Sequence, residues 1–404
     1  MAKTRIHVGL EIGTQSTRMI VGEVAANDSM TIIGIGEVPS EGVVRGEIHD
    51  SAKVSQCVYD AWCKAQDHSD VDIVSVYLAV TGKHIYGENN NGTFRLPKGE
   101  TVVSRAHMNE VCKIAKDLPI AIDRGYLHRV IGNYTLDGQV KHSSPENELA
   151  ETLDVHCHII HGTENLINKA NRCVKDVPLS LNDVVFSPLA ASLTLLKRED
   201  KMAGSLVIDI GAGTTDFVLY VDGDLVASGC VPLGGDHISN DIHLLFDVPL
   251  AQAELLKKTE GDANGFIGKS NEVVRMSGDG RMRDIAVNRA ELNRIIRDRI
   301  EEIFNLVRKS LPEGTFEKRQ CRTVYLCGGS SLMRGIGELA KQIFGVNIIL
   351  PSSEAEKSSV YFDNPRYTTV IGLLRYAQIV HDENETSRKE TSIFRKILGI
   401  FGKN

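Results

Sequence analysis

Two glycine-rich turns contain the residues of this chain that could bind a phosphorylated ligand. The second turn follows an apolar run at 206–210 and contains Gly211, Ala212, Gly213, Thr214 and Thr215. Glycine lets backbone N–H groups approach a ligand closely, and successive N–H groups with nearby hydroxyls form an anion site. Asp209 precedes the turn, where its carboxylate could hold a hydrated Mg²⁺ beside a phosphate. For this stretch alone, a plain β-hairpin with a glycine turn is the alternative interpretation.

The first turn repeats this plan near the start of the chain. Within residues 8–24, Glu11 takes the place of Asp209, and Gly13, Thr14 and Gln15 follow it. Two copies of strand, acid, glycine turn and strand favour a duplicated domain whose facing hairpins hold a polyphosphate and its metal. A third signal is the pair Gly328-Gly329 after the apolar run 323–327, where a nucleoside could lie flat against the backbone.

This ordered set resembles the nucleotide-binding signature of the actin, Hsp70 and sugar-kinase superfamily. Within it, the chain resembles the FtsA family of actin-like bacterial cell-division proteins. The matching segments are 8–14, 76–85, 207–216, 327–329, 369–374 and the C-terminal tail, so they cover nearly the whole chain. The resemblance implies an α/β fold of two actin-like, ribonuclease H-like domains around a nucleotide cleft, with a small α+β insert in the first domain.

The resemblance also implies which residues hold the nucleotide. ATP would bind between the two turns, with Glu11 and Asp209 acting on Mg²⁺ through water. Glu254 and Lys257 would contact the ribose and adenine, although an exposed ion pair at this helical spacing explains them equally well. The other residues expected at the nucleotide are Gly234, Gly235, Ser330 and Met333.

Catalysis is expected to be slow. Ser187 stands where relatives in the superfamily often carry a Glu that positions the attacking water. Without a carboxylate or amide at this position, help from a general base should be weak. The sequence therefore predicts at most a slow ATPase and assigns no catalytic residue.

The resemblance and local composition together divide the chain. We expect the first actin-like domain at 1–82 and 164–198 with a return at 361–378, and the inserted subdomain at 83–163. The second domain should occupy 199–250 and 320–360, with a small outer subdomain at 251–319. A polar linker at 379–390 and a membrane-targeting helix at 391–404 complete the chain. Within these parts, 89–92 is predicted as a turn and 197–201 as a charged linker.

The C-terminal tail, residues 391–404, has the pattern of an amphipathic helix. Six large apolar side chains fall on one side at helical spacing, namely Ile393, Phe394, Ile397, Leu398, Ile400 and Phe401. Arg395, Lys396 and Lys403 lie on the other side. A peptide this short needs a surface to fold on. The bulky aromatics and basic polar face favour the membrane interface over docking on the protein's own core.

Composition limits the classes of function. The 404 residues allow more than one domain, and the net charge of −7 argues against bulk nucleic-acid binding. No stretch approaches the length of an apolar membrane span, and the start lacks the pattern of a signal peptide. The eight cysteines are scattered, which indicates reduced thiols in a cytosolic protein.

Together these features predict an ATP-binding, polymerising adaptor at the cytoplasmic face of the bacterial cell membrane. By resemblance, its partners would be FtsZ filaments, copies of itself, the inner leaflet and other division proteins at the division site. A small-molecule kinase of the same superfamily is the alternative. That alternative requires a catalytic acid for a substrate hydroxyl and leaves the tail unexplained.

Overall fold

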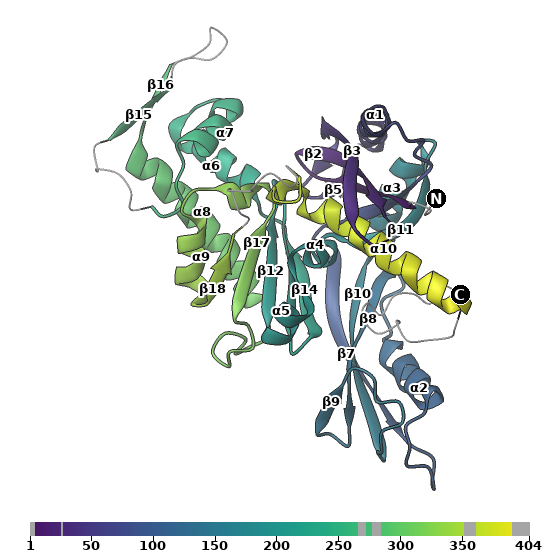
Figure 1. The fold of residues 1–404 in the computed structure, drawn as a ribbon. Helices are drawn as coiled ribbons and strands as arrows, with labels where there is room; N and C mark the ends of the chain where they lie inside the picture. The colour runs from purple at the N-terminus through teal and green to yellow at the C-terminus, as the bar shows by residue number, and fades with distance from the viewer. Residues whose placement is uncertain (1–4, 26, 266–271, 277–283, 351–360, 390–404) are drawn as a thin grey trace.

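The computed structural model describes residues 5–25, 27–265, 272–276, 284–350 and 361–389. Two α/β domains lie side by side, and a smaller sheet domain projects from the first of them (Figure 1). The α/β fold of two actin-like domains with an α+β insert is thereby confirmed. The tail at 391–404 and the amphipathic helix predicted there lie outside the described residues.

The first domain is built on a five-stranded sheet with the order β11-β6-β1-β2-β3. Its strands are β1 (Arg5–Ile12), β2 (Ser16–Val24), β3 (Met30–Pro39), β6 (Ser75–Val80) and β11 (Ser180–Phe186). Helices α1 (Ser51–Ser69) and α3 (Glu164–Lys175) pack on one face, and α4 (Ser187–Leu195) and α10 (Thr368–Lys389) on the other. Alternate residues of β2 supply both cores, because Met19 and Val21 face α1 whereas Ile20 faces α10.

The second domain repeats this sheet. Its order is β14-β13-β12-β17-β18, with strands β12 (Ser205–Ile210), β13 (Thr215–Val221), β14 (Asp224–Val231), β17 (Thr323–Cys327) and β18 (Asn347–Ile349). In both sheets, three antiparallel strands come first in the chain and two parallel strands are added at one edge. The internal duplication predicted from the two turns is therefore present in the fold.

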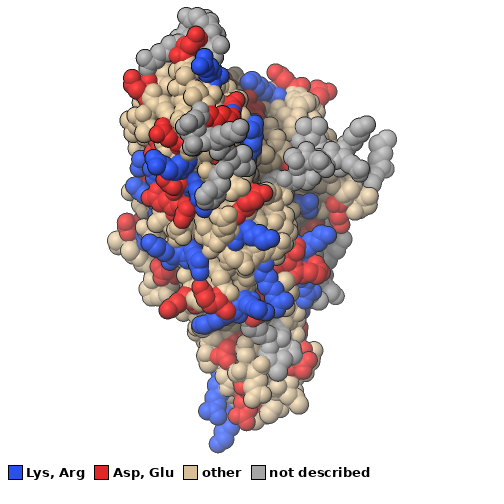
Figure 2. Space-filling view, turned by 90° about the vertical axis from the view of Figure 1, so that its left-hand side faces the viewer, with Lys and Arg blue, Asp and Glu red and all other residues tan. Residues whose placement is uncertain are grey.

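Helices complete the second domain and its outer part. They are α5 (Arg198–Ala203), α6 (Gly235–Phe246), α7 (Leu250–Thr259), α8 (Arg289–Lys309) and α9 (Ile336–Phe344). The outer part also carries the hairpin of β15 (Val273–Met276) and β16 (Ile285–Asn288). Figure 2 shows that acidic and basic side chains are interspersed on this side of the molecule. An ion pair of Arg299 with Asp241 joins α8 to α6.

The insert is a four-stranded antiparallel sheet with one helix. Its strands are β7 (Ile85–Arg95), β8 (Arg124–Leu136), β9 (Val140–His142) and β10 (Thr152–Thr163), in the order β7-β10-β8-β9, and its helix is α2 (Arg105–Lys116). Ser104 caps α2, because its hydroxyl accepts the backbone N–H of His107.

The turn predicted at residues 89–92 is wrong. These residues lie inside β7, which pairs with β10 along the whole length of β7. The ladder overrides the turn preference of three asparagines, because two of their side chains find partners: Asn89 contacts His158, and Asn90 donates to the carbonyl of Ala115. Gly92 fits here because a Cβ would lie 2.3 Å from the carbonyl of Val111 in α2.

Two predicted linkers are helical. Residues 197–201 contribute to α5, where the carboxylate of Asp200 accepts the backbone N–H of Lys197 and caps the helix start. Residues 379–389 continue α10 to Lys389. The polar composition suggested a linker, but a helix nucleated on a buried core extends at little cost through good helix formers. Arg5 of β1 also pairs with Asp382 at 2.7 Å. In the part of the chain that is described, no helix has both the length and the apolar character of a bilayer span.

The packing of α10 on α4 leads to a prediction about stability. A Cβ at Gly372 would lie 1.9 Å from the carbonyl oxygen of Ala190. Gly372→Ala should therefore force the helices apart and destabilise the fold by about 1–3 kcal/mol, measured by denaturant unfolding. Gly125→Ala is the control, because its nearest neighbour would lie 3.6 Å away. Equal stability of both variants would contradict this account of the helix pair.

Candidate nucleotide site

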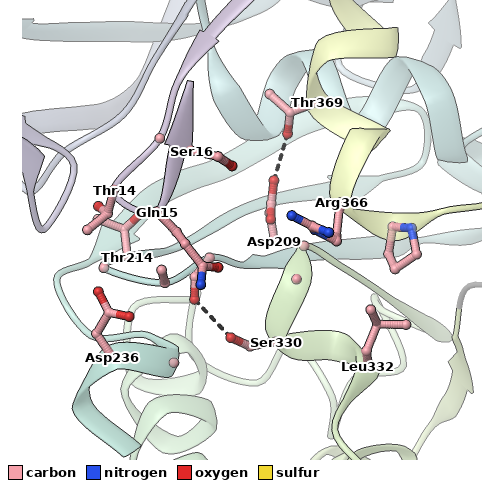
Figure 3. A pocket seen from close by; sticks show the side chains of 18 of the residues that line it. Thr14, Gln15, Ser16, Asp209, Thr214, Asp236, Ser330, Leu332, Arg366 and Thr369 are labelled. Atoms are coloured by element: carbon pink, nitrogen blue, oxygen red, sulfur yellow. Dashed lines mark hydrogen bonds between the residues drawn. The ribbon is translucent and has the colours of Figure 1, made fainter. Parts of the chain in front are cut away.

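A cavity of about 480 Å³ lies between the two domains. Both glycine-rich turns line it, and Figure 3 shows Thr14 and Gln15 on one side facing Thr214, Asp236 and Ser330 on the other. Most residues predicted at the nucleotide line this cavity: Glu11, Gly13, Thr14, Gln15, Asp209, Gly211, Ala212, Gly213, Thr214, Gly235, Glu254, Lys257, Gly328, Gly329, Ser330 and Met333.

The two turns have the same backbone closure. The N–H of Gly13 donates to the carbonyl of Ser16 at 3.1 Å, and the N–H of Gly211 donates to that of Thr214 at 2.9 Å. The turns also touch across the cleft. A Cβ at Gly213 would lie 2.4 Å from Oγ1 of Thr14. This contact requires glycine in the second turn, because any side chain would separate the two domains.

Acidic side chains stand at the floor of the cavity. Glu11 pairs with Arg18 at 3.3 Å, and Asp209 accepts a hydrogen bond from Thr369 Oγ1 at 2.7 Å. A third acid, Asp216, accepts from Thr81 Oγ1 at 2.5 Å and lies one turn away on β13. Burial raises the pKa of Glu11 and of Asp216 to about 7, and it also raises the pKa of Asp209. Such buried carboxyls are stabilised in their ionised form by a cation.

The Gly328 segment closes the opposite side. Gly328 has φ of +82°, and a Cβ there would lie 2.2 Å from Oδ1 of Asp209. A short 3₁₀ turn, η1 (Gly329–Leu332), follows, and Ser330 Oγ donates to the carbonyl of Gly211 at 3.0 Å. This hydrogen bond joins the expected nucleoside loop directly to the second phosphate turn.

Glu254 and Lys257 form an ion pair on α7 at 2.5 Å. The pair differs from an ordinary exposed pair, because Lys257 is only 7% exposed and its Nζ also donates to the carbonyl of Gly235 at 2.9 Å. Both residues line the cavity, so the pair fixes α7 against the start of α6 while keeping polar atoms at the cavity wall.

Two residues predicted at the nucleotide do not line the cavity. Thr215 is fully buried, and its hydroxyl donates to the carbonyl of Leu233 at 2.9 Å. Thr215 is the first residue of β13, and unlike the preceding Thr214 it does not line the cavity. Gly234 lies behind the turn, where a Cβ would be 2.6 Å from the carbonyl of Ala212. Both hold the second turn in place from outside the cavity.

Sequence reasoning missed several residues that line the cavity. They are Ser16, Arg18, Thr81, Asp216, Asp236, Lys258, Leu332, Arg334, Arg366 and Thr369, among others. Asp216 could have been found, because it directly follows the second turn. Thr369 lies in a segment that resembles the family, but nothing local placed Thr369 or Arg366 at the cavity, since they reach Asp209 and Glu37 only when the chain returns to the first domain.

Ser187 lies in the cavity wall at the start of α4. Its hydroxyl donates to the carbonyl of Val80 at 3.0 Å, and the side chain is buried. A serine hydroxyl is a much weaker base than a carboxylate, and this one already donates its proton to a carbonyl. The expectation of weak general-base help from this position therefore stays a prediction.

Comparison with known proteins identifies the family. Residues 206–372 match the family model described as cell division protein FtsA, and residues 82–161 match the SHS2 domain inserted in FtsA. The chain is 31% identical over 370 residues to cell division protein FtsA of Neisseria meningitidis serogroup B, covering 91% of this chain and 89% of that protein. This chain belongs to the FtsA family. FtsA of Escherichia coli K12 is 29% identical over 398 residues, with 96% and 94% of the two chains covered.

Solved structures with lower identity share the fold. The PilM–PilN type IV pilus biogenesis complex matches with a TM-score of 0.62 at 18% identity, covering 92% of this chain and 98% of that chain. MreB 5 of Spiroplasma citri, bound to AMPPNP, matches with a TM-score of 0.54 at 16% identity, covering 95% and 99%. This member of the FtsA family is therefore an actin-like cell-division protein.

The cavity fits a nucleoside triphosphate with a hydrated divalent cation. Its volume lies in the usual range of small-molecule sites. Glycines at 13, 211, 213 and 328 leave backbone exposed where a Cβ would meet neighbouring atoms. Glu11 and Asp209 could hold the waters of Mg²⁺, which would supply charge neutralisation for the phosphates.

Gly213→Val should abolish or strongly weaken binding of both ATP and ADP. The branched side chain would collide with Thr14 and with the backbone of Arg45, whose Cα lies 2.8 Å from the Cβ position. We expect at least about a tenfold rise in Kd for both nucleotides, measured by titration calorimetry. Gly125→Ala serves as the control for a tolerated glycine substitution. If the Gly213 variant binds ATP and ADP with wild-type affinity, the two glycine-rich turns do not form the phosphate site.

The raised carboxyl pKa values predict a pH effect on metal-dependent binding. Glu11 and Asp216 hold protons below about pH 7 in the metal-free protein, so Mg²⁺·ATP must displace them. Binding should therefore strengthen from about pH 6 to about pH 8, as measured by Kd with and without Mg²⁺. A pH-independent affinity would contradict this role for the acids.

The raised pKa of Glu11 also determines how the stability of the fold changes with pH. The folded state keeps the Glu11 proton up to about pH 7, whereas the unfolded chain releases it near the ordinary value of 4.5. This contribution to the metal-free fold is present at low pH and is lost as pH rises through about 7. Glu11→Gln should remove that part of the pH slope of the melting temperature.

Proposed function

We propose that this protein binds ATP with Mg²⁺ in the cleft and acts as a nucleotide-dependent adaptor of cell division. The observation that carries the proposal is the pair of matching turns that touch across the cleft at Gly213 and Thr14. Two N–H-rich turns facing one cavity suit a ligand with several phosphates, which can contact both domains at once. The solved structure of MreB 5 with AMPPNP, a protein of the same fold, supports the choice of ATP.

ATP would act mainly by holding the two domains closed. A ligand that contacts both turns favours the conformation in which the turns are close together. Turnover would be slow, since Ser187 offers no strong base. Closed protomers would then assemble into actin-like filaments, so the nucleotide serves as a switch for polymerisation and hydrolysis is secondary.

The adaptor role adds a membrane and a filament partner. We propose that filaments of this protein lie at the cytoplasmic face of the membrane at the division site, tether FtsZ filaments and recruit other division proteins. Membership of the FtsA family supports this role. The basic and apolar faces of the tail at 391–404 support the membrane contact.

One tail should bind reversibly, and many tails on one filament should bind firmly. Interfacial burial of the apolar side chains is partial and ordering the helix costs entropy, so the net free energy per tail is small. Arg395, Lys396 and Lys403 would add roughly 1 kcal/mol each near an anionic leaflet. Each further tail of a filament engages at high effective concentration. Polymerisation and membrane attachment should therefore reinforce each other.

The double variant Phe394→Glu with Phe401→Glu should release the protein from anionic liposomes. Two aromatic side chains proposed to enter the membrane interface are replaced by charges that the interface and the anionic lipid both disfavour, so the floating fraction should fall at least about tenfold. The floating fraction is measured by flotation of the liposomes in the presence of ATP. FtsZ should float with the liposomes only when the protein that binds them is present.

The matched control is Thr386→Glu with Ser387→Glu, which adds the same charge just before the tail. This control should float like wild type, and both double variants should keep their affinity for ATP. If the Phe394/Phe401 variant still floats, the tail is not the anchor.

A further inference from the structure

A small hairpin of the first domain reaches the point where the two turns meet. It consists of β4 (Val43–Val44) and β5 (Glu47–Ile48), with Arg45 and Gly46 at its tip. The tip touches both turns. The N–H of Gly46 donates to Oγ1 of Thr14 at 3.0 Å, and a Cβ at Gly213 would lie 3.0 Å from the N of Arg45.

The tip has an unusual backbone for an arginine. Arg45 has φ of +51° and Gly46 has φ of +75°, so both lie in the left-handed region. Glycine occupies this region freely, whereas a residue with a long side chain is rare there and is held by its surroundings. A Cβ at Gly46 would lie 3.0 Å from the methyl group of Thr214 and 3.1 Å from that of Thr81. The fold thus fixes a strained arginine beside the phosphate turns, where glycine would be easier to accommodate.

The cations that line the cavity are already engaged. Arg18 pairs with Glu11 and Glu37, Arg366 pairs with Glu37, and Lys257 and Lys258 pair with Glu254. Arg334 donates to the carbonyl of Thr259. Each of these groups has an acceptor before any ligand arrives.

Arg45 differs from them. It is exposed, and among the described residues its guanidinium has no hydrogen-bond or ion-pair partner. Its charge reaches the start of α6 in the second domain, because burial and then the charge of Arg45 lower the pKa of His237. The adjacent Asp236 lines the cavity. The backbone of Arg45 therefore lies where the two turns meet, and its uncommitted charge acts on the start of α6 in the second domain.

We propose that Arg45 binds the terminal phosphate of the bound nucleotide and makes the site distinguish ATP from ADP. The inference rests on the proposed nucleotide function and goes beyond it by naming the residue that senses the third phosphate. Guanidinium is well matched to phosphate oxygens, since it offers several N–H donors in one plane. The γ-phosphate would join the hairpin of the first domain to the turn of the second. After hydrolysis and phosphate release, this link would be absent.

Arg45→Gly tests the proposal without endangering the fold. Glycine accepts the left-handed backbone, so the melting temperature of the nucleotide-free variant should equal or exceed that of wild type. With Mg²⁺ present, the Kd for ATP should rise about ten- to a hundredfold. The Kd for ADP should stay within about twofold, since ADP has no third phosphate. Both constants are measured by titration calorimetry.

Two further variants sharpen the result. Arg45→Lys keeps the charge but not the planar donors, and it should retain part of the preference for ATP. Lys53→Ala removes an exposed cation of the same domain, which pairs with Glu41 at 3.3 Å, and it should bind both nucleotides like wild type.

The outcomes separate this proposal from the function on which it rests. If Arg45→Gly keeps the wild-type ratio of ATP to ADP affinity, Arg45 does not sense the third phosphate, although the nucleotide site stands. An equal loss for both nucleotides also overturns the proposal. If wild-type protein binds neither nucleotide, the proposed function itself fails.

Discussion

The structure depends on one contact that only glycine permits. Gly213 brings the backbone of the second turn against Thr14 of the first domain and Arg45 of its hairpin, at distances that leave no room for a Cβ. Each turn is short because a single backbone hydrogen bond closes it. This close approach sets the spacing of the two turns at the cavity, and an apolar core shared by both domains supports it. A ligand with negative charge at this point would act on both domains together.

The three buried acids behind the turns carry a desolvation cost when they are ionised. Glu11, Asp209 and Asp216 are buried close enough that the charge of Asp209 raises the pKa of the other two. Arg18 offsets part of this repulsion, and hydroxyls of Thr81 and Thr369 take up the rest of the hydrogen bonding. Protons are the simplest neutralising partners in the absence of metal. A hydrated cation would replace them and leave the carboxylates ionised, so metal binding and proton release are linked.

The sequence predicted those features of the fold and the site that depend on residues close together in the chain. The duplicated turns and the Gly328-Gly329 pair were predictable, because each depends on glycine, hydroxyl or apolar residues that are close in sequence. The insert was expected from the resemblance to the FtsA family. Thr81, Arg366 and Thr369 were not predictable, since their role comes from the return of the chain to the site. At Asn89 the pairing with β10 outweighed turn preference, and beyond residue 378 a nucleated helix outweighed polar composition. The function of the tail still depends on the sequence pattern alone.

The length of α10 has a mechanical consequence. The helix begins beside the cavity between the domains, where Thr369 contacts Asp209, and it ends at Lys389 beyond the pair of Arg5 with Asp382. Figure 1 shows it crossing the first domain as one continuous rod. A helix of this kind rises about 1.5 Å per residue, so it works as a stiff lever arm across the domain. A small rotation of the helix at the cavity would therefore become a larger displacement at its far end, which a flexible linker would not transmit.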